Sequence, residues 1–148
     1  MSAAQAAPPA HELPVRVYFE DTDAGGIVYH ANYLRFAERA RTEFMRSVGY
    51  DHRRLADEHG LLFAVARAAM AFLTPARLDD LLLVRTRVVR LGGVRLELNQ
   101  EVWREKASIA RIGITLALLD TETLRPKRMP EALRQQFATA LDGPAAPA

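Results

Sequence analysis

The side chains best suited to chemistry stand together in residues 18–33. This segment reads Tyr-Phe-Glu-Asp-Thr-Asp-Ala-Gly-Gly-Ile-Val-Tyr-His-Ala-Asn-Tyr, with Asp21 and Asp23 in a glycine-bearing turn. A helical pattern starts at Asn32, and the free N–H groups of a helix start favour developing negative charge. A carboxylate close to such a site is a hydrolytic arrangement. Asp23 would attack a carbonyl or deprotonate a water molecule, and His30 would orient the substrate, the water or Asp23.

Other interpretations of the two aspartates remain open. Asp-Thr-Asp also forms Asx turns at strand ends. Asp-x-Asp loops bind Ca²⁺ or Mg²⁺, which would make the protein a metal-dependent enzyme. The same pattern occurs in sugar-nucleotide transferases, but this chain of 148 residues shows no mononucleotide-binding βαβ unit. Short motifs match by accident, so an Asx turn is the main rival to a catalytic role.

Other hydrolytic machinery is missing from the sequence. There is no cysteine, and none of the serines lies in a Gly-x-Ser-x-Gly motif. There is no Walker-type phosphate loop and no Gly-x-Gly-x-x-Gly. His52 and His59 do not have the His-Glu-x-x-His spacing of a zinc site, and we interpret them as part of a solvated helix surface. Asp23 is therefore the best candidate, and we expect neither a metal nor a cofactor.

The composition is that of one soluble globular domain. Hydrophobic residues make up 49% of the chain and charged residues 26%. A net charge of +2 makes no strong case for a nucleic-acid partner. No window is long and apolar enough for a membrane span, and the N-terminus does not resemble a signal peptide. Together with the lack of cysteine, these features favour a cytoplasmic location.

Hydrophobic periodicity predicts an α+β fold with one helix packed on an antiparallel sheet. We expect disordered tails at 1–12 and 139–148, which are rich in alanine and proline, around a domain at 13–138. The helix is predicted to begin with Asn32 as its N-cap and to stop at Gly49. The predicted strands cover 15–20, 61–73, 81–91, 94–103 and 108–119, with a hairpin at Gly92-Gly93.

Residues 17–33, followed by Phe-Ala-Glu-Arg-Ala-Arg-Thr-Glu at 36–43, closely resemble the YbgC branch of the 4-hydroxybenzoyl-CoA thioesterase family. These are hot-dog-fold proteins, often associated with the Tol-Pal system. Arg125-Pro126 and Met129-Pro130-Glu131 are similar to the closing segment of the family. The resemblance covers about residues 13–135 in length and element order.

The resemblance implies a long central helix wrapped by an antiparallel sheet of about five strands. It also implies hydrolysis of acyl-CoA to free acid and CoA, in a homodimer or homotetramer with active sites at the subunit interface. Asp23 matches the catalytic carboxylate of the family. His30 matches the residue at the helix start, where a backbone N–H polarises the thioester carbonyl and the imidazole assists.

We expect further residues of the motif to contact the substrate, namely Tyr18, Gly26, Tyr29 and Asn32. Relatives often carry Tyr-Tyr where this chain has Tyr18-Phe19. This departure leaves open a second hypothesis, in which a hot-dog protein with weak or no activity binds acyl carrier protein or an envelope partner of the Tol-Pal type.

Arginine and lysine side chains are expected to bind the CoA phosphates. The candidates are Arg85, Arg87, Arg125, Lys127 and Arg128. Glu38 and Arg41 are interpreted as an ion pair on the helix surface. Trp103 lies on the polar face of its predicted strand, where an exposed tryptophan would mark a subunit contact.

Overall fold

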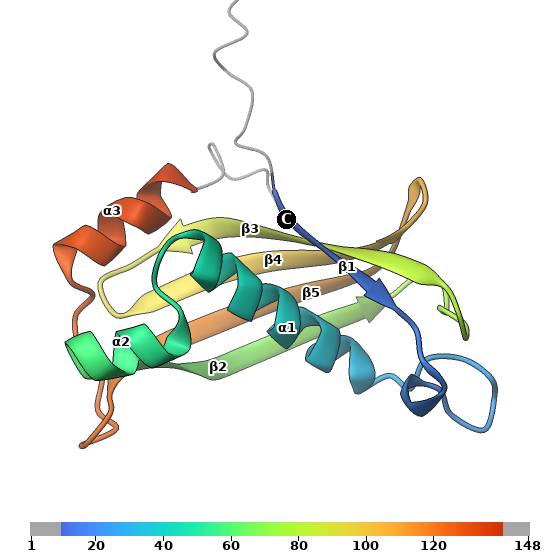
Figure 1. Ribbon diagram of the computed structural model, residues 1–148, viewed down its shortest axis with the longest axis horizontal. Helices are drawn as coiled ribbons and strands as arrows, with labels where there is room; N and C mark the ends of the chain where they lie inside the picture. The colour runs from blue at the N-terminus through green and yellow to red at the C-terminus, as the bar shows by residue number, and fades with distance from the viewer. Residues whose placement is uncertain (1–9, 141–148) are drawn as a thin grey trace, which may run out of the picture.

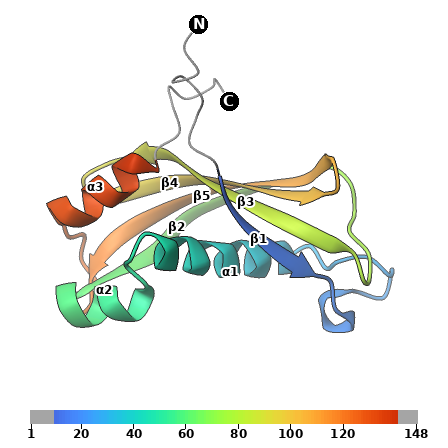
Figure 2. The ribbon, with the colours of Figure 1, turned by 45° about the horizontal axis from the view of Figure 1, so that its top comes forward.

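One antiparallel sheet curves around a long helix (Figures 1 and 2). The computed structural model describes residues 10–140, and the tail segments 1–9 and 141–148 lie outside the described residues. The strands are β1 (His11–Arg16), β2 (Leu61–Phe72), β3 (Leu81–Leu91), β4 (Arg95–Arg104) and β5 (Ala107–Asp120). The helices are α1 (Asn32–Ser47), α2 (His52–His59) and α3 (Glu131–Thr139), with a 3-10 turn at Phe19–Asp21. This is the predicted α+β hot-dog arrangement.

The sheet has the strand order β1-β3-β4-β5-β2, and every neighbouring pair is antiparallel. Strands β3, β4 and β5 follow one another as a meander, with burial alternating along β3 and β4. Alternate side chains of a strand point to opposite faces, so one face of these strands packs inward. Strands β1 and β2 form the two edges of the sheet.

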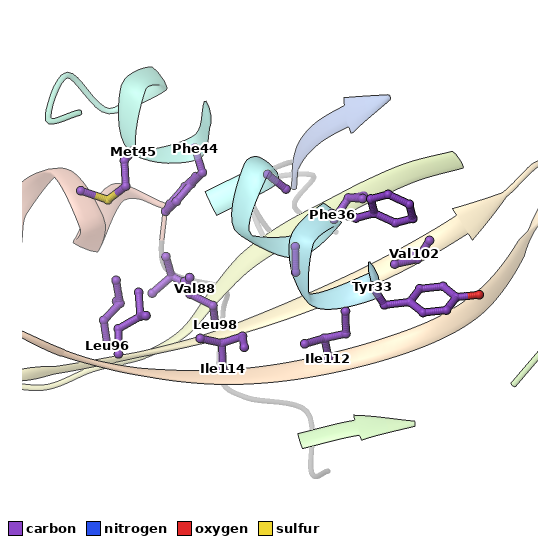
Figure 3. Packing of buried hydrophobic residues seen from close by; sticks show 14 of the residues in the cluster. Tyr33, Phe36, Phe44, Met45, Val88, Leu96, Leu98, Val102, Ile112 and Ile114 are labelled. Carbon is purple, nitrogen blue, oxygen red and sulfur yellow. The ribbon is translucent and has the colours of Figure 1, made fainter. Parts of the chain in front are cut away.

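Helix α1 buries the apolar stripe that its sequence predicts. Figure 3 shows Tyr33, Phe36 and Phe44 facing the inward side chains of the sheet, which include Val88, Leu98, Val102, Ile112 and Ile114. Each large apolar side chain that leaves water contributes about 1.5–3 kcal/mol to folding. Gly49 follows the helix with a φ of 87°, a left-handed conformation that glycine adopts without strain.

Two predictions at the N-terminal side of the site are wrong. The first strand covers 11–16 and not 15–20, so residues 11 and 12 of the predicted tail belong to the sheet. The chain turns at Phe19–Asp21 because the Asp21 carboxylate accepts a hydrogen bond from the Tyr18 N–H (2.8 Å). The N-cap position of α1 is Ala31, and the Asn32 side chain donates to Asp21 and does not cap the helix.

The surface ion pair expected for Arg41 is also wrong. Arg41 is only 8% exposed, and its Nη1 donates to Gln100 Oε1 on β4 at 3.0 Å. Its position follows from the helical period, because residue 41 falls beside Ala37 and Phe44 on the buried stripe. The other predicted strands agree with β2 to β5 to within one residue at each end.

Candidate active site

The loop between the 3-10 turn and α1 holds the Asp23 carboxylate at the surface. A bridge between Thr22 and Val28 closes the loop, and the Asp23 N–H donates to Ile27 O at 2.9 Å. Asp23 Oδ1 accepts the Gly25 N–H at 2.8 Å, which is an Asx turn. Within residues 10–140, Oδ2 accepts no hydrogen bond. The Asx turn therefore orients the carboxylate and leaves one oxygen available to water or substrate.

Glycine is required where this loop is tightest. A Cβ atom on Gly25 would lie 3.1 Å from Asp23 Oδ1, closer than an ordinary van der Waals contact. Gly26 has a φ of 79° and open space where a Cβ would be. The first glycine lets its N–H approach the carboxylate, and the second lets the chain reverse without backbone strain.

Asp21 has a structural environment that differs from that of Asp23. It is 4% exposed, and its two carboxylate oxygens accept the Tyr18 N–H and the Asn32 amide, each at 2.8 Å. Its carbonyl oxygen accepts the Tyr29 N–H at 2.9 Å. Asp21 thus ties the 3-10 turn to the first residue of α1. Asn32 is connected to the loop by the hydrogen bond from its side-chain amide to Asp21.

The start of α1 presents free donors and an aromatic surface. The His30 and Ala31 N–H groups make no hydrogen bond within the described residues. The centroid of the exposed His30 ring lies 4.5 Å from that of the Tyr29 ring, with the planes tilted by 51°, and 6.5 Å from that of the Phe72 ring on edge strand β2. Tyr29 is 47% exposed, and Tyr18 lies exposed on the other side of the loop. Five of the predicted residues are thus exposed and Asn32 is buried, and no contact joins the Asp23 carboxylate to the His30 ring.

A second turn, at residues 75–80, is hydrogen-bonded to the Asp23 loop and supports it. The Val28 N–H donates to Ala76 O at 2.9 Å, and Ile27 bridges to Arg77. The Ala76 N–H in turn donates to the hydroxyl oxygen of buried Tyr33 at 3.2 Å. This support was missed by sequence reasoning because the two turns lie almost fifty residues apart.

Asp80 and Arg104 hold this second turn in place. Arg104 Nη1 donates to Asp80 Oδ2 at 2.8 Å and to Pro75 O at 2.9 Å, and the Arg77 N–H also donates to Asp80 Oδ2. Burial acts to raise the pKa of the Asp80 carboxyl, but the Arg77 N–H and the Arg104 guanidinium outweigh it and lower the pKa below its ordinary value. The adjacent Asp79-Asp80 pair marked a turn in the sequence but not its partner.

The expected phosphate-binding cations lie elsewhere in the protomer. Residues 125–128 follow β5, whose last residue pairs with Leu61, whereas Phe72 of the site is at the opposite end of β2. Arg85 pairs with Glu12 at 2.7 Å and lies 4.5 Å from the Trp103 ring centroid. Trp103 is thus partly covered within its own chain.

Residues 10–140 contain neither a cluster suited to a metal ion nor a membrane-spanning helix. This part of the chain has no group of three or more His, Asp or Glu side chains placed to hold a metal ion. Within the same part, no helix is long and apolar enough to cross a membrane.

A long helix wrapped by a five-stranded antiparallel sheet defines a protein of the hot-dog fold. The sequence profile of the Thioesterase-like superfamily matches residues 17–137. The acyl-CoA thioesterase YbgC of Haemophilus influenzae is 40% identical over 125 residues, which are 84% of this chain and 92% of that protein. The acyl-CoA thioester hydrolase YbgC of Escherichia coli O157:H7 is 36% identical over the same shares.

Solved structures agree with these relatives. A probable thioesterase from Bartonella henselae superposes with a TM-score of 0.78 at 37% identity, covering 82% of this chain and 99% of that one. The chain therefore belongs to the thioesterase-like superfamily and is a thioester hydrolase.

Replacing Asp21 by alanine is predicted to destabilise the fold. The substitution leaves the buried Asn32 amide and the Tyr18 N–H without their acceptor, which should lower the free energy of unfolding by about 2–3 kcal/mol. Urea denaturation measures the change. Asp23→Ala is the matched control, and we expect it to cost less than about 1 kcal/mol because Asp23 is exposed. Equal losses in the two variants would contradict the structural role of Asp21.

Replacing Asp80 by asparagine is predicted to have an effect that depends on pH. The folded-state pKa of Asp80 is lowered, so its contribution to stability is present above the unfolded value of 3.8 and is lost as the pH falls through the folded value. We expect Asp80→Asn to cost about 1 kcal/mol at pH 7. Denaturation curves from pH 7 to pH 2.5 should show the difference in unfolding free energy between wild type and variant becoming smaller. A difference that stays constant with pH would contradict the ionic contribution.

Proposed function

We propose that this chain hydrolyses acyl-CoA to a free acid and CoA, with Asp23 as nucleophile or general base. The observation that supports this proposal is the free Asp23 Oδ2 in the loop that leads to the unbonded N–H groups of His30 and Ala31. In such a site the N–H groups donate to the thioester carbonyl oxygen, which becomes an oxyanion when the carbonyl carbon is attacked.

The two roles of Asp23 differ in the attacking atom. As a general base, Asp23 takes a proton from water, and the oxygen of that water adds to the carbonyl carbon. As a nucleophile, Asp23 adds directly and forms an anhydride that water then opens. In both routes the carbon–sulfur bond breaks, and the CoA thiolate leaves and is protonated. The exposed His30 imidazole lies at the helix start, where it can supply that proton or orient the acyl group.

The remaining residues of the motif are proposed to shape the substrate site. The exposed rings of Tyr18 and Tyr29 stand on the two sides of the loop. Gly26 places no side chain over the loop and leaves space for the thioester group. Asn32 holds Asp21 and so fixes where α1 begins relative to Asp23. A cytoplasmic location belongs to the same proposal.

A homodimer formed through β2 is part of the proposal. This edge strand has twelve residues, and Val65 and Phe72 are each about half exposed along it. A long apolar edge strand without a neighbour pairs readily with another strand. A two-fold axis perpendicular to the sheet would pair β2 with its own copy in the antiparallel direction, and a tetramer would require a second interface.

Such a dimer would change which cations lie near the thioester. The two ends of β2 are about 35 Å apart along an extended strand. Antiparallel pairing would bring the Leu61 end of one protomer towards the Phe72 end of the other. Arg125 and Arg128 at the first end would then reach CoA phosphates at the site of the other protomer, as would Lys127, which ion-pairs with Asp120 at 3.4 Å.

A second candidate function is binding of a protein partner, with only weak thioester hydrolysis. Phe19 is 82% exposed at the position where relatives often carry tyrosine, so a hydroxyl that would orient water is missing from the surface of the site. A hot-dog protein of this kind would bind acyl carrier protein or an envelope partner. It would release thiol only slowly from a broad acyl-CoA panel, while carrier binding would survive Asp23→Asn.

Asp23→Asn is predicted to lower kcat/KM for acyl-CoA by at least about 10²-fold, because the amide can neither attack nor accept a proton at neutral pH. Release of free thiol measures the rate, and an unchanged unfolding midpoint serves as the folding control. Full activity in the variant would remove Asp23 from the mechanism. A single turnover in ¹⁸O-labelled water separates the two roles, because only the nucleophilic route places the label in the Asp23 side chain.

A lysine in place of exposed Ala69 is predicted to separate the protomers, because a charge in the middle of β2 opposes strand pairing. Ala69→Ser is the matched control of similar size. Sedimentation should show a dimer for wild type and the control and a monomer for Ala69→Lys, together with a raised KM for acyl-CoA. A monomeric wild type with full activity would contradict the proposed interface.

A further inference from the structure

A cavity of about 150 Å³ lies beneath the C-terminal half of α1. Its walls come from α1, from His52 of α2 and from strands β2, β4 and β5, and most of the lining is apolar, including Phe44 and Phe63. Arg41, Phe44 and Met45 of its lining lie more than two helical turns from the start of α1, where the Asp23 loop ends, and Glu38 lies nearer to it. An apolar cavity of this size holds a ligand as large as a benzene ring.

A buried guanidinium forms part of this apolar wall. Arg41 lines the cavity, and its one hydrogen bond runs from Nη1 to Gln100 Oε1. Gln100 is fully buried and donates its own amide to Ala37 O and to Thr86 Oγ1, each at 2.9 Å. Arginine can only donate, so these three contacts fix the orientation of the Gln100 amide. Gln100 thus anchors one edge of the guanidinium, whose other N–H groups are not engaged by described residues.

Arg41 has no carboxylate within ion-pair distance in the described part of the chain. Burial lowers the pKa of the guanidinium, and the charge of exposed Glu38 at the cavity mouth acts in the opposite direction. Taking a cation out of water is unfavourable unless a counter-charge or several hydrogen bonds compensate. A planar guanidinium with free donors is best matched by a carboxylate, which accepts two parallel hydrogen bonds.

We propose that this cavity is a binding site for a carboxylic acid with an apolar tail of about six carbons. The carboxylate pairs with Arg41, and the tail lies against the apolar wall. Glu38 at the mouth repels the carboxylate and weakens its binding. The cavity binds such an acid whether or not the chain hydrolyses acyl-CoA. Retention of the acid that hydrolysis produces is a consequence that rests on the proposed function.

Two other origins of the counter-charge are decided by two further measurements, the turnover of the active chain and the sedimentation of Glu38→Gln. A carboxylate at the far end of an acyl group would have the same chemistry as a free acid. A second copy of this chain could instead direct its own Glu38 towards Arg41. The first would show as faster turnover of ω-carboxyacyl-CoA than of simple acyl-CoA without binding of a free acid. The second would show as loss of the dimer in Glu38→Gln.

The test is calorimetric titration of the full chain carrying Asp23→Asn, which separates binding from turnover. Hexanoate is the probe, and hexanamide has the same shape without the charge. We expect hexanoate to bind at least tenfold more tightly than hexanamide. Arg41→Gln should abolish this difference, and Glu38→Gln should increase the affinity. Arg39→Gln, an exposed arginine on the same helix, should have no effect.

A second variant keeps the test valid if Arg41→Gln does not fold. Val65 is a half-exposed residue of the cavity wall, so Val65→Trp obstructs the cavity without removing a buried group. It should weaken hexanoate at least tenfold, whereas Val65→Ala should not, and sedimentation of both variants checks that the β2 interface is unchanged. Equal binding of hexanoate and hexanamide, or hexanoate binding unchanged in Val65→Trp and Arg41→Gln, overturns the proposal. So does either of the alternative results described above.

Discussion

The packing of α1 against the curved sheet determines where the other elements of this protein lie. One stripe of the helix, from Tyr33 to Phe44, is buried against the inward side chains of the meander (Figure 3). Because that stripe can face the sheet in only one orientation, the helix start is held beside Phe72 at the end of β2. The loop before the helix has to reach this point, which places Asp23 at the edge of the sheet.

The two aspartates of the motif show how environment assigns different roles to the same residue type. Asp21 is buried, with both oxygens occupied by donors from the 3-10 turn and from α1. Asp23 is exposed, with one oxygen held by the Gly25 N–H and one free. The buried carboxylate stabilises the loop geometry, and the exposed one has the freedom that chemistry requires. An Asx turn and a catalytic role are therefore compatible at Asp23.

Buried polar groups elsewhere also differ in whether their hydrogen-bonding capacity is used within the protein. The Arg41–Gln100–Thr86 chain of hydrogen bonds crosses from α1 to two strands, and it leaves a cation at the wall of an apolar cavity. The Asp80–Arg104 pair satisfies its own charges and supports a turn. Buried polar groups that are fully paired stabilise the fold, whereas those with spare donors mark places where a ligand can bind.

Local sequence was sufficient for α1, for four of the strands and for the family, because hydrophobic periodicity and the 17–33 motif depend only on neighbouring residues. It placed the first strand and the helix cap wrongly, since the Asp21 carboxylate takes the Tyr18 N–H and the Asn32 amide across a turn. Only the tertiary structure decided that Arg41 is buried, that residues 75–80 support the Asp23 loop and that the basic C-terminal segment lies far from Phe72, beside which α1 begins. These contacts are made between residues tens of positions apart in the sequence. A local sequence pattern does not predict which distant segments come together when α1 packs on the sheet.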